Sequence, residues 1–340
     1  MEDNLRYKKQ RTRLIICIAI LILIIIGGIC AFFVLDNMNK KEDDTPKKEV
    51  GDKTQKEEIT PLMYEITKEG SDNKIYLFGS MHSVNLDEFD FPDYVINAYN
   101  NSDYLAVEFD ILKALEDPNV VQNELKNMTY QDGSTIKDHI SEETYKKLVE
   151  KMEEKYIYNS AFDLYSAYFF ESLLSSLVLE DAGISSDDGV DTYFLQKAKD
   201  ENKKILEVES YELQSNILTN FSDRLYELML LSYLDYYDDQ VEGIKELYQI
   251  WKNGDPKELI KLVEDDEDTE GYSLEDIKLY EEYNKALTTD RNIGMTDKLI
   301  DYFENNKKVF FMVGAAHLIG DDGIANLLIN EGYTVTQINK

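Results

Sequence analysis

Two of the three histidines in this chain follow strand-like segments at the same spacing. The sequence GSMH places His82 three residues after Gly79, and GAAH places His317 three residues after Gly314. Each glycine ends an apolar run, IYLF in one case and VFFMV in the other, which is typical of a buried strand. The remaining histidine, His139, lies in the polar sequence IKDHIS and is predicted to be a surface residue. The repeated motif therefore predicts a paired histidine site.

Acidic residues lie at or near the ends of two further strand-like segments. The sequence DYLAVEFD indicates a buried strand with Glu108 in its apolar interior. A charge there is costly to bury unless it is paired or belongs to a site. The sequence KKILEVE places Glu207 and Glu209 two residues apart, so both are expected on the same face of a strand. In parallel sheets the site lies beyond the carboxyl ends of the strands, where His82 and His317 would also emerge.

The two ends of the folded region show the same order of elements: strand, G-x-x-H, loop, short helix, strand. A right-handed crossover of this kind is expected to place its two strands side by side and parallel. Most of residues 111–182 and 211–305 have helical periodicity and are expected to be large insertions. The expected fold is therefore α/β, with a mixed sheet whose parallel strands come from both ends of residues 61–340.

The N-terminal region is predicted to anchor the protein in the cell membrane. Residues 14–35 form an uncharged apolar run that is long enough to span a bilayer as one helix. The run is longer than a signal-peptide core and no small-x-small cleavage sequence follows it. Basic residues within 1–13 predict a cytoplasmic tail under the positive-inside rule. The polar residues 36–60 are expected to form a flexible linker, which leaves 61–340 as an extracellular domain.

Charge and cysteine content exclude several classes of function. The chain has 36 basic and 68 acidic residues, and its formal net charge of −32 repels the phosphates of nucleic acids, which disfavours nucleic-acid binding. Such acidity attracts divalent cations without specificity, so it does not itself indicate a metal site. Both cysteines, Cys17 and Cys30, lie in the predicted membrane span. The expected domain therefore has no disulfide, no cysteine nucleophile and no all-cysteine metal site.

The order of these motifs resembles the TraB/GumN family. That family includes the pheromone-shutdown proteins and is related to the Tiki membrane metalloproteases and, more distantly, to erythromycin-esterase and ChaN-like proteins. The resemblance covers roughly residues 62–340 and rests on LFGSMH, VEFD, GVDTYFLQKA with ILEVESYELQ, DRNIGM and VGAAHLIGDDG. It implies the mixed α/β fold of those proteins and a set of site residues, namely His82, Glu108, Glu209, Gln214, Arg291, Asn292 and His317. The choice of Glu209 over Glu207 rests on its spacing to Gln214.

These residue types predict a catalytic metal site in a hydrolase. His82, His317 and Glu108 would hold a divalent ion such as zinc, manganese or cobalt. A metal there would lower the pKa of a bound water and polarise a substrate carbonyl. Glu209 would take the proton, and Arg291 would steady an oxyanion or a substrate carboxylate. The expected substrate is a peptide or protein outside the cell.

Other interpretations remain open at this point. A histidine paired with a glutamate could activate water without a metal, as in an esterase-like hydrolase. The protein could instead capture a secreted peptide without cleaving it, with the histidines as ligands. Single residues also have ordinary structural interpretations: Arg291 as a helix salt bridge, Glu209 as a solvated strand end and Gln214 as a packing residue.

Overall fold

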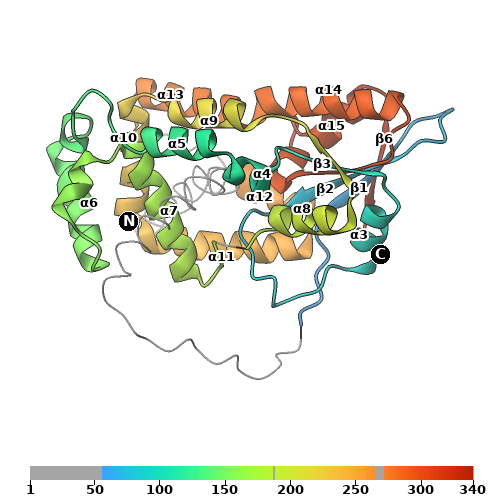
Figure 1. Cartoon of the computed structure of the whole chain (residues 1–340), viewed down its shortest axis with the longest axis horizontal. Helices are drawn as coiled ribbons and strands as arrows, with labels where there is room; N and C mark the ends of the chain where they lie inside the picture. The colour runs from blue at the N-terminus through green and yellow to red at the C-terminus, as the bar shows by residue number, and fades with distance from the viewer. Residues whose placement is uncertain (1–55, 187, 265–271, 340) are drawn as a thin grey trace.

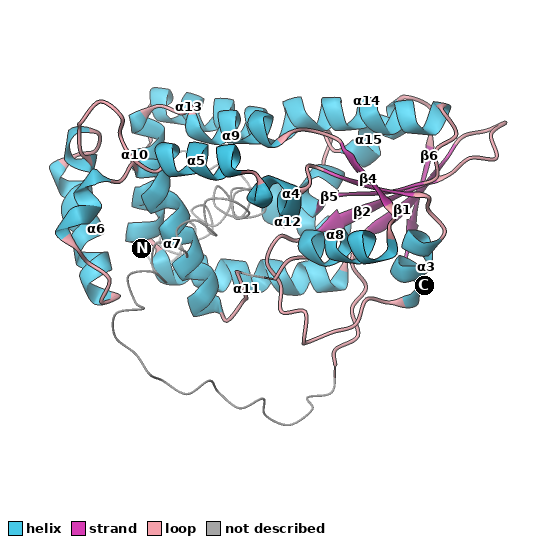
Figure 2. Ribbon diagram, in the orientation of Figure 1, coloured by secondary structure: helices cyan, strands magenta, loops and turns pink. Residues whose placement is uncertain are grey.

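The computed structural model describes residues 56–186, 188–264 and 272–339 (Figures 1 and 2). The strands are β1 (Met63–Thr67), β2 (Ile75–Ser80), β3 (Tyr104–Val107), β4 (Lys204–Glu207), β5 (Val309–Gly314) and β6 (Thr334–Ile338). The longer helices are α3 (Asp93–Asn100), α4 (Ile111–Glu116), α5 (Pro118–Asn127), α6 (Glu142–Glu154), α7 (Ala167–Ala182), α8 (Val190–Glu201), α9 (Tyr211–Thr219), α10 (Asp223–Asp235), α11 (Tyr237–Asn253), α12 (Pro256–Glu264), α13 (Leu274–Asn284), α14 (Asp290–Glu304) and α15 (Ile324–Asn330).

The predicted cytoplasmic tail (1–13), the predicted membrane span (14–35) and residues 36–55 of the predicted linker lie outside the described residues. Among the helices that are described, none combines the length and apolar character needed to cross a bilayer. Residues 56–60, which the sequence assigns to the linker, already contact the domain. Ile59 is buried, and the Thr60 N–H donates to the Lys252 carbonyl at 2.7 Å.

The sheet formed by the described residues combines strands from both ends of the domain, in the order β4-β3-β5-β2-β1-β6. Strand β5, from the C-terminal end, pairs in parallel with both β2 and β3. Strand β3 also pairs in parallel with β4, whereas β1 is antiparallel to β2 and β6. The mixed α/β fold expected from the sequence is therefore confirmed for this part of the chain.

The strands expected to lie side by side at each end of the domain are not neighbours in the sheet. The sequence predicts β2 beside β3 and β5 beside β6, but β5 lies between β2 and β3, and both β2 and β1 separate β5 from β6. Burial gives the physical reason. Every residue of β2 and β5 is buried, which suits central strands covered on both faces. Strand β6 is largely exposed or half-buried and lies at the sheet edge.

Helices cover both faces of the sheet. On one face, Tyr99 of α3 and Phe194 of α8 pack against Phe310 of β5. On the other face, Tyr302 of α14 packs against Phe311. Phe310 and Phe311 are consecutive in a strand and therefore point to opposite faces. The result is a three-layer arrangement, with α14 and α15 on one side of the sheet and α3 and α8 on the other (Figure 1).

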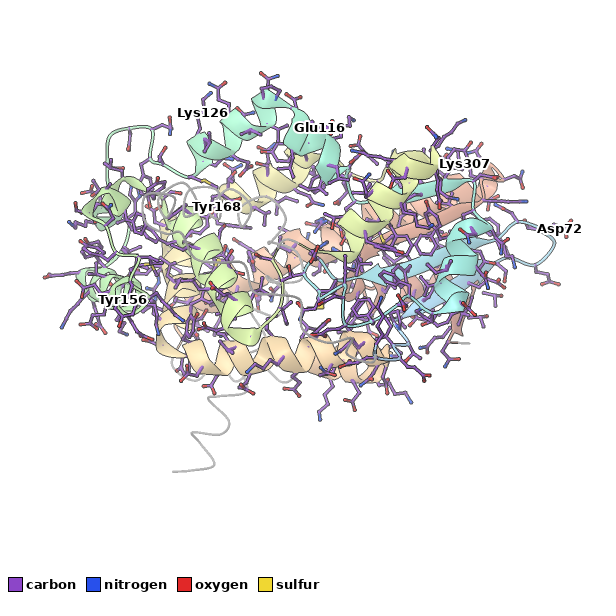
Figure 3. The ribbon with its side chains drawn as sticks, turned by 60° about the horizontal axis from the view of Figure 1, so that its bottom comes forward. Asp72, Glu116, Lys126, Tyr156, Tyr168 and Lys307 are labelled. Carbon is purple, nitrogen blue, oxygen red and sulfur yellow. The ribbon has the colours of Figure 1, made fainter. Side chains whose placement is uncertain are left out.

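The helical insertions pack beside this three-layer part. Helix α7 is buried on nearly all sides and packs against α10 and α11. Tyr168 on α7 lies in this helical part, far from Asp72 in the β1–β2 turn (Figure 3). Side-chain caps mark the starts of several helices, such as α6, where the Ser141 hydroxyl accepts a hydrogen bond from the Thr144 N–H. One hydrophobic cluster runs through both parts.

Candidate active site

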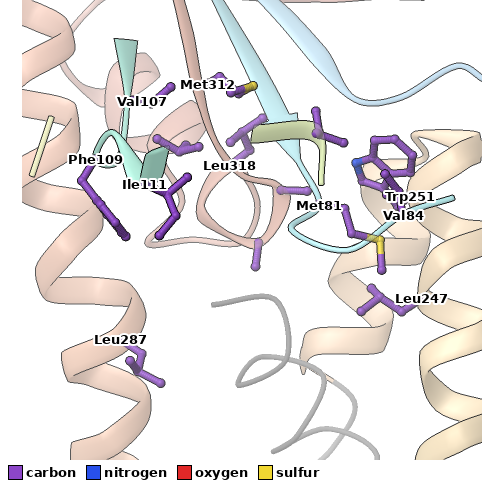
Figure 4. Close-up of a cluster of buried hydrophobic side chains, with 14 of the residues drawn as sticks. Met81, Val84, Val107, Phe109, Ile111, Leu247, Trp251, Leu287, Met312 and Leu318 are labelled. Atoms are coloured by element: carbon purple, nitrogen blue, oxygen red, sulfur yellow. The ribbon is translucent and has the colours of Figure 1, made fainter. Parts of the chain in front are cut away.

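The carboxyl ends of β2, β3 and β5 bring His82, Glu108 and His317 together. Strand β2 ends two residues before His82, β3 ends immediately before Glu108, and His317 lies in the short 3-10 turn η4 (Ala315–Leu318) that follows β5. Because these strands are adjacent and parallel, their ends meet at one edge of the sheet. All three side chains are buried. Apolar side chains, including Met81, Phe109 and Leu318, surround this edge (Figure 4).

The side chains of these three residues surround a common space beside Gly314. A Cβ atom on Gly314 would lie 3.5 Å from Oε1 of Glu108, 3.5 Å from Cδ2 of His317 and 3.7 Å from Nε2 of His82. Nε2 of His317 lies 3.9 Å from Oε1 of Glu108. The absence of a side chain at Gly314 therefore leaves room between the three groups.

His82 is held by Asp191, which is not among the site residues expected from the sequence. Nδ1 of His82 lies 2.8 Å from Oδ2 of Asp191, and the Ser80 hydroxyl donates to Oδ1 at 3.0 Å. Burial disfavours the charged imidazole, but the Asp191 and Glu108 carboxylates together outweigh this effect and raise the pKa of His82. Asp191 lies in the first turn of α8. It also lies in the motif GVDTYFLQKA that carries the family resemblance, but acids in a first turn usually complement the helix dipole, so Asp191 was not expected to be a site residue.

His317 is held by an amide instead of a carboxylate. Its Nδ1 lies 2.6 Å from Oδ1 of Asn292 on α14, and the Asn292 side-chain NH₂ donates to the Asp322 carbonyl at 2.9 Å. That second contact turns the amide oxygen towards the imidazole, so Nδ1 of His317 carries the hydrogen. Burial and the nearby Arg291 guanidinium lower the pKa of His317 to about 3. Asn292 is one of the residues implied by the family resemblance.

Both histidines leave Nε2 buried and without a hydrogen-bond partner among the described residues. When Nδ1–H of a neutral imidazole is donated, Nε2 carries a lone pair. In the neutral rings both lone pairs therefore lie on Nε2; Nε2 of His317 is 3.9 Å from Oε1 of Glu108, Nε2 of His82 lies beside the same Gly314, and this donor set suits a divalent metal. Within residues 56–186, 188–264 and 272–339, no group of three or more His, Cys, Asp or Glu side chains is arranged so that it could already hold a metal ion. The fit therefore rests on the two unpartnered nitrogens and the nearby carboxylate oxygen.

Glu108, Glu209 and Arg291 form a buried ionic cluster. Nη2 of Arg291 lies 2.6 Å from Oε2 of Glu108 and 2.7 Å from Oε2 of Glu209. The Gln214 side-chain NH₂ donates to both carboxylates, at 2.8 and 3.1 Å. The Gly314 N–H donates to Oε1 of Glu108 at 2.9 Å. Burial would raise the pKa of Glu108, but Arg291 and the two histidines hold it well below its usual range.

The guanidinium of Arg291 is fully engaged inside the chain. Its Nε donates to both oxygens of Glu209, and its Nη1 donates to the Leu287 carbonyl at 3.3 Å. Arg291 lies in the first turn of α14, directly after the π-helical segment η3 (Lys285–Thr289). Segments of this kind often occur at functional sites. The contacts make Arg291 the counter-ion of two carboxylates.

Two other residues considered from the sequence lie outside this cluster. Glu207 is exposed and pairs with Lys113 at 3.1 Å, whereas Glu209 is turned towards Arg291. The two glutamates, expected on one face, thus have different partners because β4 ends at Glu207. His139 is half-buried and stacks on the ring of Tyr130 at 3.7 Å between centroids.

Comparison with known proteins identifies the family. The model of the TraB/PrgY/gumN family matches residues 62–337. The chain belongs to the TraB/PrgY/gumN family. The uncharacterized protein YbaP of Escherichia coli (strain K12) is 24% identical over 253 residues, which cover 74% of this chain and 87% of YbaP. YbaP of Shigella flexneri matches with the same values. No solved structure matches this chain.

The family membership predicted from the motifs is therefore confirmed. The TraB/PrgY/gumN match includes every residue of the buried cluster, from His82 near its beginning to His317 near its end. The site thus belongs to the TraB/PrgY/gumN segment of the chain.

Proposed function

We propose that this protein is a hydrolase that uses a divalent metal ion held by His82, His317 and Glu108. The observation that carries the proposal is the pair of buried Nε2 atoms that have no hydrogen-bond partner among the described residues: that of His317 lies 3.9 Å from Oε1 of Glu108, and that of His82 lies beside the same Gly314. Metal-ligating histidines commonly donate their other ring N–H to a carboxylate or carbonyl oxygen, as both histidines do here. Zinc, manganese and cobalt each accept imidazole and carboxylate ligands.

When bound, such a metal lowers the pKa of a water molecule and polarises the substrate carbonyl. The residues of the chain prepare the site for that chemistry. Asp191 and Asn292 orient the two imidazoles, and Gly314 keeps the space between them free. Arg291 keeps the Glu108 carboxylate ionised, so that Oε1 can accept a further partner. In this proposal Glu209 remains the second carboxylate of the site, and Arg291 acts as a counter-ion instead of binding substrate.

We further propose a peptide or protein substrate and a location outside the cell. The resemblance of the motifs to Tiki-type membrane metalloproteases supports the substrate class. The sequence of residues 1–60 supports the location, because a basic segment precedes an apolar run and a polar linker follows it. In this arrangement residues 14–35 form a single membrane-spanning helix, residues 1–13 lie in the cytoplasm and the domain from residue 61 onward lies outside.

Metal content and peptide cleavage, measured on the same purified full-length protein, test the proposal. Wild type is expected to retain a divalent metal in elemental analysis and to cleave peptides from a mixed-sequence library. His82→Ala and His317→Ala should each lose both properties. His139→Ala is the matched control and should keep both, because that histidine lies outside the buried cluster.

The other outcomes separate the alternatives. Cleavage that survives exhaustive chelation would favour a metal-free, esterase-like hydrolase. Peptide retention without cleavage would favour a sequestering protein. Equal metal content in wild type and both histidine variants would refute the proposed metal site.

A further inference from the structure

We propose that Asp191 is a positioning residue that fixes the ring tautomer of His82, so that the Nε2 lone pair of His82 points into the site. The functional importance of this tautomer rests on the proposed hydrolase, but the tautomer itself can be measured without any hydrolysis. The inference extends the set of functional residues to the first turn of α8, which contributes none of the site residues expected from the sequence.

The contacts of Asp191 determine where the proton of His82 lies. The residue is 6% exposed, and both of its carboxylate oxygens have partners: His82 at Oδ2 and the Ser80 hydroxyl at Oδ1. An ionised carboxylate only accepts hydrogen bonds. Nδ1 of His82 must therefore be the donor, and its Nε2 is left free of hydrogen in the neutral ring.

The main chain around His82 is held independently of this side-chain contact. The Val84 N–H donates to the Asp188 carbonyl at 2.9 Å, and the Val190 N–H donates to the Met81 carbonyl at 3.0 Å. A Cβ atom on Gly189 would lie only 2.3 Å from the His82 carbonyl oxygen, so the two segments approach closely. Backbone contacts thus set where His82 lies, and the Asp191 carboxylate sets how its ring is protonated.

His317 also carries its hydrogen on Nδ1, but there the partner is the Asn292 amide instead of a carboxylate. Asn292 could present either its oxygen or its NH₂ to His317, but its contact with the Asp322 carbonyl selects the oxygen. At position 191 the neighbouring partner is a serine hydroxyl, which can donate or accept. An amide placed there would have no fixed orientation. We therefore expect Asp191→Asn to lose control of the His82 tautomer.

Nitrogen-15 NMR of histidine-labelled, chelator-treated full-length protein tests the inference. The chain contains three histidines, so His139→Gln and His82→Gln suffice to assign the imidazole signals. At a pH above the raised pKa of His82, where both rings are neutral, wild type should show His82 and His317 with hydrogen on Nδ1. In Asp191→Asn the His82 signals should shift towards a mixture that includes Nε2–H, whereas those of His317 and His139 stay unchanged and report that the variant is folded.

Two further measurements sharpen the test. Ser80→Ala removes the hydroxyl but keeps the carboxylate, so His82 should retain hydrogen on Nδ1. Zn²⁺ titration of Asp191→Asn should show affinity roughly 10- to 100-fold weaker than wild type, as is usual when the partner of a ligating histidine is lost.

The inference is overturned if wild-type His82 carries its hydrogen on Nε2, a result that needs no folded variant. It is also overturned if Asp191→Asn leaves the His82 tautomer unchanged. Failure of the proposed function looks different: the NMR result would hold, but wild type would bind no metal and cleave no peptide.

Discussion

The glycines of the two G-x-x-H motifs meet different surroundings. A Cβ atom on Gly79 would lie 3.0 Å from both Cα and Cβ of Ala315 and 3.3 Å from Leu318, so Gly79 allows β2 to pack against the turn after β5. A Cβ atom on Gly314 would meet its neighbours at ordinary contact distances, and those neighbours are the polar groups of the site. The backbone of Gly314, with φ of −51°, is accessible to any residue. The first glycine of the motif therefore has two different roles: Gly79 allows close packing, whereas Gly314 leaves space between the polar groups of the site.

Gly314→Ala should therefore abolish metal binding without unfolding the protein. The added methyl group would occupy the space between the two imidazoles and Glu108, at distances that require no backbone movement. We expect a melting temperature close to that of wild type together with loss of bound metal in elemental analysis. Gly294→Ala on α14, where a Cβ would meet no atom within 4 Å, is the control and should keep the metal. Wild-type metal content in Gly314→Ala would show that the space is not the metal site.

At the scale of elements, the buried ionic cluster connects α14 to the ends of two strands. Arg291 lies on α14, Glu108 follows β3, and Glu209 lies two residues beyond the end of β4. These side chains are at most 6% exposed, so little solvent screens their interaction. The cluster therefore links the helix that carries Asn292 to the strand ends that carry the carboxylates.

Arg291→Met should destabilise the protein by about 3–5 kcal/mol, because it leaves two carboxylates buried without their counter-ion. Arg224→Met is a matched control. Arg224 also pairs with two carboxylates, Asp276 at 2.8 and 3.0 Å and Glu227 at 3.2 Å, but its side chain is 47% exposed, so water can replace it and its loss should cost less than that of Arg291. Urea unfolding of both variants measures the difference. The added change Glu209→Gln should recover part of the loss in Arg291→Met. Equal costs for the two arginines would contradict the role given to the cluster.

At the scale of the whole molecule, the sequence predicted the individual strands and turns better than the order of the strands in the sheet. The apolar runs and G-x-x-H motifs predicted strands and turns because these features are local. The neighbours of β5 could not be predicted, since the choice of central strand depends on which faces the helices cover. Glu108 was recognisable as a charge in an apolar run. Asp191 lies in the motif GVDTYFLQKA, but its contact with His82 was not predictable, because the two residues are distant in the sequence and an acid in a first turn is common.

The helical part contains a carboxyl group that couples folding to pH. Glu171 on α7 is buried and accepts a hydrogen bond from the Tyr233 hydroxyl on α10 at 3.3 Å. Burial raises the pKa of Glu171 from 4.5 to about 8, although the hydrogen bond acts in the opposite direction. Between these two values the folded protein keeps a proton that the unfolded chain has lost. The contribution of Glu171 to stability is therefore complete below pH 4.5 and is lost as the pH rises towards 8.

Glu171→Gln should remove this dependence, because glutamine has a similar shape and stays neutral at every pH. The free energy of unfolding of the variant, relative to wild type, should rise between about pH 5 and pH 8 by at most about 1.4 kcal/mol per pH unit. Urea unfolding across that range measures it. Glu180→Gln, at an exposed position of the same helix, should show no such trend. Parallel curves for wild type and Glu171→Gln would exclude a buried proton at Glu171, because the other titrating groups are common to both proteins and cancel in the difference.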